Sequence, residues 1–148
     1  MQHGRAMAEA NDPRRCLSSE GAQAVTRIAA WAQKADIRIQ QIRHSGKLRA
    51  EQTAQIVADH LKITCGVVRV SGLGPNDDIN PVARSIQTEV ANFMLVGHLP
   101  FLSRLVGLLV SGDPELQVVR FYNAGIVCLR EERGTWSVGW ALTPELLA

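Results

Sequence analysis

The sequence predicts an α/β fold, a three-layer α/β/α sandwich with a mostly parallel central sheet. Segments with helical spacing of apolar residues alternate along the chain with short strand-like segments. Residues 92–98, NFMLVGH, form an apolar run that is typical of a strand buried on both faces of a parallel sheet. The 148 residues contain no repeat, low-complexity segment or linker, so we expect one domain over residues 1–148.

The first half of the chain is expected to hold two helices and two strands. Ser18 is the predicted N-cap of a helix that runs to residue 34, because apolar residues follow it at helical spacing. Alternating isoleucines predict a short strand over residues 37–45. A second helix is expected over residues 46–61, and GVVRV, residues 66–70, is the next predicted strand.

The second half begins with a loop that is rich in Gly, Pro, Asn and Asp. A third helix is expected from Pro81 to about residue 89, and Pro100 suits the first turn of a fourth helix that ends near residue 110. Three strands complete the prediction, one over residues 116–121 and two that form a hairpin over residues 125–142 with its turn near Arg133 and Gly134.

Composition limits the classes of partner. The net charge is only +2, which gives no electrostatic argument for binding nucleic acid or an anionic membrane. Three cysteines, an odd number without CxxC spacing, indicate reduced thiols rather than a disulfide framework or a zinc site. Because the sequence also shows no signal peptide and no apolar run long enough for a membrane span, we expect a cytoplasmic protein.

The predicted chemistry lies where strands end, because ligands of open α/β sheets bind beyond the carboxyl ends of the strands. Three segments meet this condition: the start of the chain, the segment HSGKLRAEQT, and GHLP after the apolar strand. Together they supply His3, His98, Lys47 and Arg49. Arginine binds phosphate oxygens through two N–H groups, and neutral histidine is a competent nucleophile near pH 7. The pattern therefore indicates a phosphoryl group as the ligand.

The order of these motifs carries a family resemblance. A His-Gly pair near the N-terminus, then LRAEQT, then GHLP resembles the histidine phosphatase superfamily, which is also called phosphoglycerate mutase-like. The resemblance covers the whole chain. An R-x-L-S-x-x-G segment is most similar to the SixA-type phosphohistidine phosphatase branch, and its residues are Arg15, Leu17, Ser18 and Gly21.

The resemblance implies a role for each matching residue. His3 would accept the phosphoryl group as a covalent phosphohistidine, Arg49 would clamp the phosphate, and His98 would stabilise the transition state from the opposite side. No metal and no cofactor are implied. The general acid has no clear equivalent, so Asp77 and Asp78 are the nearest candidates, although turn roles are more common for such residues. The expected phosphate-binding residues are Gln2, Gly4, Arg15 and Ser45.

Two departures from the family pattern stand out at the start of the chain. Gln2 occupies the position of the motif arginine, and loss of a charge-assisted contact costs about 1.5–3 kcal/mol, roughly ten- to a hundredfold in rate. Only Met1 precedes the motif, where the family has an apolar central strand. We therefore expect an open cleft between unpaired neighbours and a natural chain that begins earlier; if the chain starts at Met1, its amino group would lie beside His3 and partly replace the missing guanidinium.

The leading hypothesis is a phosphohistidine phosphatase that acts on a phosphorylated protein, for instance a phosphorelay domain. Alternatives are a phosphomonoesterase for a small phosphoester and a phosphate- or phosphoprotein-binding pseudoenzyme, the latter because of Gln2. Simpler interpretations exist for single residues: His3 could be part of an unstructured terminus, Arg49 could be a solvated helix residue, and His44 and His60 are expected at the surface. The sequence has no HxH, HExxH or GxSxG, which disfavours metallohydrolases and serine hydrolases.

Overall fold

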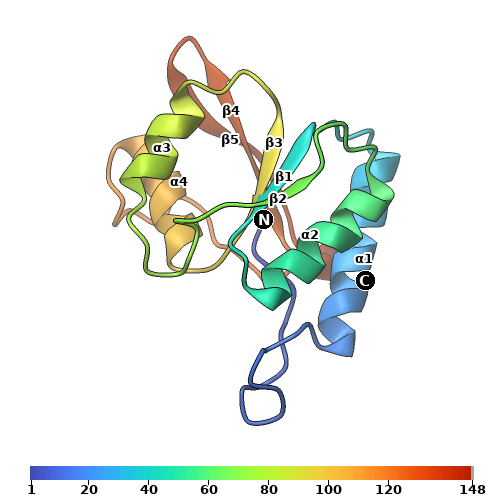
Figure 1. The fold of residues 1–148 in the computed structure, drawn as a ribbon. Helices are drawn as coiled ribbons and strands as arrows, with labels where there is room; N and C mark the ends of the chain where they lie inside the picture. The colour runs from blue at the N-terminus through green and yellow to red at the C-terminus, as the bar shows by residue number, and fades with distance from the viewer. Residues whose placement is uncertain (148) are drawn as a thin grey trace.

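The computed structural model describes residues 1–147. Helices and strands alternate along the chain up to the C-terminal hairpin, as the sequence predicts (Figure 1). The elements are α1 (Ser19–Lys34), β1 (Gln41–His44), α2 (Leu48–His60), β2 (Val67–Arg69), α3 (Asn80–Gln87), β3 (Phe93–Val96), α4 (Phe101–Ser111), β4 (Ile126–Glu132), β5 (Thr135–Leu142) and the 3₁₀ helix η1 (Pro144–Leu147).

The central sheet is parallel and has the strand order β2-β1-β3. Helices α1 and α2 cover one of its faces and α3 and α4 lie on the other side (Figure 1). Two apolar clusters follow from this arrangement, one built around α1 and α2 and the other around α3 and α4. The predicted three-layer α/β architecture is confirmed.

The C-terminal hairpin forms a second, antiparallel sheet of β4 and β5. Its turn lies at Arg133 and Gly134, which both have positive φ, 54° and 80°. Positive φ at both central residues is typical of the type I′ turn, which matches the twist of a hairpin. The predicted hairpin and its turn are confirmed.

Two predicted strands differ from the structure. Residues 116–121 form no strand, because their valines pack against the α3–α4 cluster without a neighbouring strand to bond to. β1 starts only at Gln41. Ile37 and Ile39 pack against the cluster around α1 and α2, and the chain before them turns at Asp36, which has a φ of 51°. At both places the alternation of apolar residues reflects burial and not a strand.

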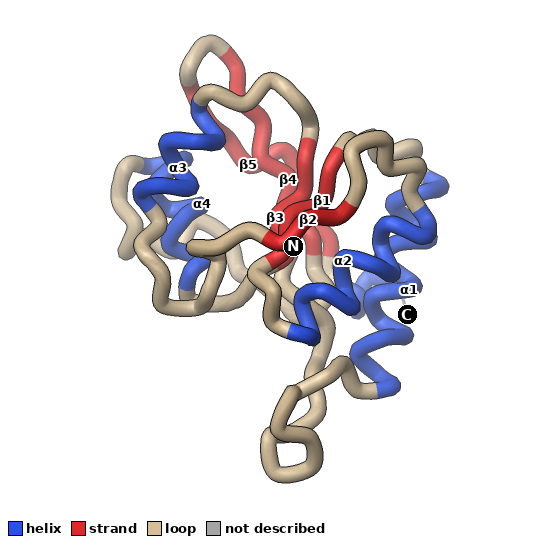
Figure 2. The backbone as a smooth tube through the Cα atoms, in the orientation of Figure 1, coloured by secondary structure: helices blue, strands red, loops and turns tan. Residues whose placement is uncertain are grey.

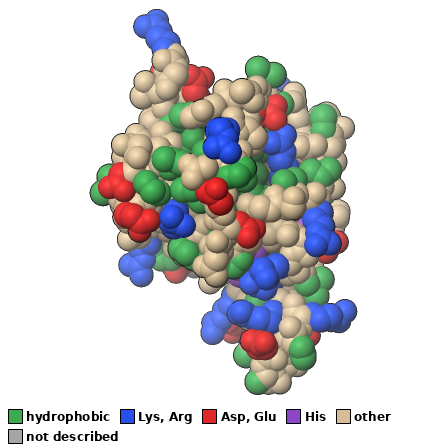
Figure 3. Space-filling model, turned by 60° about the vertical axis from the view of Figure 1, so that its left-hand side comes forward, with side chains coloured by type: hydrophobic (Ala, Val, Ile, Leu, Met, Phe, Trp, Pro, Cys, Tyr) green, Lys and Arg blue, Asp and Glu red, His purple; other side chains and the backbone are tan. Residues whose placement is uncertain are grey.

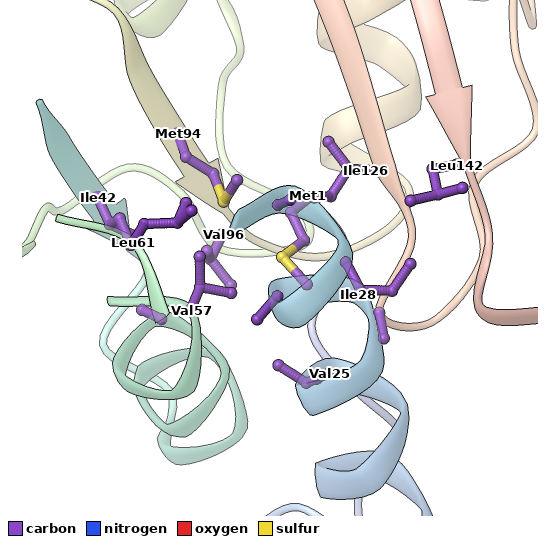
Figure 4. Packing of buried hydrophobic residues seen from close by; sticks show 14 of the residues in the cluster. Met1, Val25, Ile28, Ile42, Val57, Leu61, Met94, Val96, Ile126 and Leu142 are labelled. Atoms are coloured by element: carbon purple, nitrogen blue, oxygen red, sulfur yellow. The ribbon is translucent and has the colours of Figure 1, made fainter. Parts of the chain in front are cut away.

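The first three residues form a short strand-like stub at the centre of the molecule. Gln2 makes a parallel bridge to Gly97, directly after β3, and its amide N–H donates to Gly125 O on the other side, 3.2 Å away. Met1 is 6% exposed and packs among residues of α1, β3 and β4 (Figure 4). The stub therefore joins the central sheet to the hairpin at one end only.

On the side of Met1 that faces away from Gln2, strands β3 and β4 are separated by an open groove. Its volume is about 870 Å³, and Met1 lies in its lining. Within residues 1–147, β3 pairs with β1 and β4 with β5; apart from the contact of Met1 with Leu95 O, the edges of β3 and β4 that face the groove are unpaired. The predicted cleft is confirmed. Its other lining residues include Phe93 and Leu95 of β3, Val127 and Leu129 of β4, Leu102 and Leu105 of α4, and Trp136 and Trp140 of β5.

The α-amino group of Met1 lies inside this apolar surrounding. It donates to Leu95 O at 2.8 Å, in the position that a peptide N–H would take in a parallel ladder. Burial lowers its pKa from 8.0 to about 5, so the group is neutral at pH 7. The expectation that this amino group would replace the missing guanidinium is therefore wrong.

Between the stub and α1, the chain makes a loop that projects away from the sheet (Figure 2). An antiparallel bridge between Ala6 and Leu17 closes the loop at its base, and Met7 N–H donates to Cys16 O. α1 then begins as predicted, because the Ser18 side chain accepts the N–H of Gly21. None of the helices described in residues 1–147 is long and apolar enough to cross a membrane.

Candidate active site

Three chain segments meet at the carboxyl ends of the parallel strands. His3 is the last residue of the stub, Ser45 follows β1, and His98 lies two residues beyond β3. The rings of His3 and His98 lie 4.8 Å apart, centroid to centroid, at an interplanar angle of 53°. The structure thus brings together the two histidines that are 95 positions apart in the sequence.

The hydrogen bonds of His3 define its tautomer. The guanidinium of Arg49 has no acceptor atom, so its Nε–H donates to His3 Nε2, 3.2 Å away. The proton of the neutral ring therefore lies on Nδ1, which donates to Gly4 O at 2.6 Å. Burial lowers the pKa of His3, and the charges of Arg49 and Arg15 lower it further. A neutral ring with its Nε2 lone pair beside a guanidinium is suited to attack on a phosphoryl group.

The main chain around His3 is held by residues that the sequence analysis did not assign. Gly4 N–H donates to the buried hydroxyl of Thr53 at 3.0 Å, and the same hydroxyl donates to Arg49 O at 2.7 Å. Thr53 thus ties the candidate nucleophile to the candidate clamp. On the other side, Asn123 Nδ2 donates to His3 O at 3.1 Å. Thr53 was within the quoted LRAEQT motif; Asn123 had no sequence signal.

Gly4 is required by close packing. A Cβ at this position would lie 2.7 Å from Val25 Cγ2 and 2.9 Å from Gly21 O, both on α1. The phosphate contact expected of Gly4 stays a prediction, whereas its close packing is against α1. Any larger residue at position 4 would push the main-chain N–H of residue 4 away from the Thr53 hydroxyl.

Basic side chains surround the two histidines. Arg49 lies in the first turn of α2, and Arg15, which has a positive φ of 51°, donates from Nε to Met7 O at 3.4 Å. After burial, the groups that lower the pKa of His98 are the adjacent His3 ring, which opposes a second positive charge beside it, and the charges of Arg49, Lys47 and Arg15. Figure 3 shows a small histidine surface beside Lys and Arg side chains, where the main body meets the loop that projects below it. The site is therefore suited to an anion.

His98 is almost completely buried, with 2% of its surface exposed. Its Nε2 lies 2.6 Å from the hydroxyl of Ser45, and its Nδ1 is buried without a hydrogen-bond partner among the described residues. Burial and the basic neighbours lower its pKa to about 3, so the ring is neutral at pH 7. A phosphoryl anion beside it would reverse part of this effect by supplying negative charge.

Gln2 lies next to the candidate nucleophile in sequence but differs from it in its contacts. Its side chain is half-buried, and Oε1 has no hydrogen-bond partner in the part of the chain that the structure describes. The amide brings no charge, so Arg49 and Arg15 remain the guanidinium groups that act on His3. The predicted phosphate contact of Gln2 stays a prediction.

The remaining candidates have local roles. Asp77 Oδ2 accepts the N–H of Gly74, and Asp78 Oδ1 accepts the N–H of Asn80, so both carboxylates are engaged in the loop before α3. His60 is half-buried, and its Nδ1 contacts Ile56 O. The surface position expected for His44 is wrong: it is 5% exposed at the end of β1. Within residues 1–147 no group of three or more His, Cys, Asp or Glu is placed to hold a metal ion.

No family model matches the chain. The sequence is similar to phosphohistidine phosphatase SixA of Escherichia coli strain K12, with 28% identity over 149 residues that cover 97% of this chain and 91% of the relative.

The structure is similar to solved structures of the same kind. The protein histidine phosphatase SixA complexed with tungstate superposes with a TM-score of 0.88 at 28% identity, over 100% of this chain and 97% of the other. The putative phosphohistidine phosphatase SixA from Agrobacterium tumefaciens gives 0.78 at 25% identity, over 97% and 94%. A putative α-ribazole-5'-P phosphatase from Escherichia coli also gives 0.78, over 97% and 95%, but at 14% identity it shares the fold alone.

Proposed function

Since the chain is a homologue of SixA and belongs to the histidine phosphatase superfamily, we propose that it is a phosphohistidine phosphatase. Its substrate is a protein that carries phosphohistidine, and residues 1–148 act as a single domain. The observation that carries the proposal is the contact of Arg49 Nε with His3 Nε2, 3.2 Å, on a ring whose Nδ1–H is held by Gly4 O.

The reaction has two steps. His3 Nε2 attacks phosphorus, and the bond between phosphorus and the substrate nitrogen breaks; the substrate imidazole leaves as a neutral ring because its other nitrogen keeps a proton. Water then attacks the phosphorus of phospho-His3, the bond from phosphorus to Nε2 breaks, and inorganic phosphate leaves. A protonated imidazole is a good leaving group, so this substrate needs no strong general acid, in keeping with the local roles of Asp77 and Asp78.

The other residues stabilise charge. Arg49 and Arg15 neutralise the equatorial phosphoryl oxygens, with Arg49 also adjoining the attacking nitrogen. His98, whose ring centroid lies 4.8 Å from that of His3, donates a hydrogen bond as charge accumulates in the transition state. Ser45 lies on His98 and Gly4 holds the main chain behind His3.

The proposal is tested by trapping the phosphoenzyme. The protein is mixed with ³²P-labelled phosphohistidine protein, quenched in alkali, where phosphohistidine is stable, and digested with trypsin. Cleavage after Arg5 releases residues 1–5, a peptide with one histidine, so label in that peptide identifies His3. Label on the peptide that contains His98 would show that His98, and not His3, is the nucleophile. No label and no phosphate release from a folded chain would contradict turnover.

A second candidate function, a phosphate- or phosphoprotein-binding protein with little turnover, is favoured by Gln2, which brings no charge to the position of the motif arginine. Gln2→Arg discriminates between the two. If the missing charge limits the rate, kcat should rise roughly ten- to a hundredfold while the Kd for inorganic phosphate changes less. Gln23→Arg, which adds the same charge at an exposed position of α1, is the matched control and should leave kcat unchanged. An unchanged kcat in Gln2→Arg would show that glutamine is fully competent at this position.

A further inference from the structure

His44 is a buried histidine that the proposed reaction does not use. It is the last residue of β1 and is 5% exposed. Its Nδ1 accepts the N–H of Gly46 at 3.2 Å. This hydrogen bond requires a lone pair on Nδ1, so the ring must be unprotonated there. Desolvation, the largest cause, lowers the pKa of His44, and the ring is neutral at pH 7.

The turn that follows His44 is held from two sides. Gly46 has a φ of +85°, and the Arg69 side chain of β2 lies so close that a Cβ at position 46 would be 2.3 Å from its Nε. Arg69 pairs in register with His44, so β2 supplies the outer side of the turn and β1 the inner side. The turn is therefore a defined structure between β1 and α2.

This turn carries the contact to His98. Ser45 lies between His44 and Gly46, and its hydroxyl is 2.6 Å from His98 Nε2. The same hydroxyl accepts the N–H of Lys47 at 3.4 Å. Because His98 Nδ1 has no partner within the described residues, Ser45 makes the one side-chain hydrogen bond seen on this ring there. The orientation of His98 thus depends on where the turn places Ser45.

We infer that His44 is a positioning residue: its neutral ring fixes the turn through Gly46 and so holds the Ser45 hydroxyl against His98. The inference rests on the proposed role of His98 in phosphoryl transfer. The charged groups that act on the ring are Glu51 of α2, which favours the protonated form, and Arg69 of β2, which opposes it. Protonation of Nδ1 would place its N–H opposite the N–H of Gly46, so the hydrogen bond that holds the turn would be lost.

The test compares His44→Leu with His44→Asn. Leucine cannot accept the N–H of Gly46, whereas the asparagine amide oxygen can take the position of Nδ1. With labelled phosphohistidine protein as the probe, kcat should fall about tenfold in His44→Leu, the scale of one lost hydrogen bond, with KM within twofold. His44→Asn should stay within threefold of wild type. Equal losses in both variants would overturn the inference.

A double-mutant cycle separates positioning from general destabilisation. If His44 acts through Ser45, then His44→Leu should cost almost nothing further in a Ser45→Ala background. Independent, multiplying losses would overturn the inference. Should His44→Leu not fold, His44→Ala takes its place in the same cycle.

A structural readout keeps this test distinct from the proposed function. The ¹⁵N chemical shifts of the His98 ring should change in His44→Leu and in Ser45→Ala but not in His44→Asn. This comparison needs no substrate, so it holds even if the phosphoenzyme trap fails. Unchanged shifts in His44→Leu would show that the turn keeps its place without the histidine, and would overturn the inference.

Discussion

Replacement of His3 by asparagine should reduce phosphate release roughly 10⁴-fold or more, the scale expected when a covalent nucleophile is removed. The asparagine amide nitrogen can still donate to Gly4 O, where His3 Nδ1 donates at 2.6 Å. It has no lone pair that could replace Nε2, the atom that faces Arg49. The variant should therefore bind inorganic phosphate and fail to form a phosphoenzyme.

The measurement is the initial rate of phosphate release, with the ³²P trap run in parallel. His60→Asn is the matched control, because His60 is a half-buried histidine in the last turn of α2 whose Nδ1 contacts Ile56 O. It should keep the wild-type rate. If His3→Asn retained more than a few per cent of that rate, phosphoryl transfer would proceed by another route and direct attack of water would be the alternative.

Acidification should destabilise the fold well above the pH at which carboxylates titrate. The buried Met1 amino group has a pKa lowered from 8.0 to about 5, and that of His98 is lowered from 6.5 to about 3. The pKa values of His3 and His44 are lowered as well. For each group, the unfolded chain binds a proton at a higher pH than the folded chain does. Stability is therefore complete above the unfolded pKa and is lost as the pH falls through it.

The expected profile has two stages. From pH 8 to 6.5 only the Met1 amino group contributes, with a slope of up to about 1.4 kcal/mol per pH unit. Below pH 6.5 the three histidines add to it, and the slope becomes steeper. The lowered carboxylate pKa values, such as that of Asp78 from 3.8, come into effect only at more acid pH.

Urea unfolding at pH 8, 7, 6 and 5 measures this profile. Acetylation of the Met1 amino group is the control, because it removes the first stage and leaves the histidine stage in place. A free energy of unfolding that stayed constant between pH 8 and pH 5 would contradict the burial of these four groups.

Local signals predicted the helices well. The Ser18 cap and the hairpin turn at Arg133 and Gly134 depend on interactions within a few residues, which a sequence displays directly. Residues 116–121 show the limit of this reasoning. Alternating apolar residues report burial, whereas a strand also needs a neighbouring edge, and the sequence does not say where that edge is.

In the candidate site, too, some residues could be predicted from the sequence and others could not. His3, Arg49 and His98 were predicted by their place after strands and by their motif, and the structure brings the three together. Asn123 was not assigned, because its contact to His3 O joins two distant parts of the chain, and His44 was wrongly expected at the surface, because its burial depends on packing around the end of β1. Spacing in a sequence identifies the groups that react, whereas the groups that hold them are defined by packing.

The open groove between β3 and β4 also determines how the molecule behaves at high concentration. Two strand edges with free main-chain groups lie beside exposed apolar surface, and such edges are templates for another chain. The net charge of +2 offers little repulsion against this contact. We therefore expect self-association at high concentration to begin at this groove, through pairing of these strand edges with another copy.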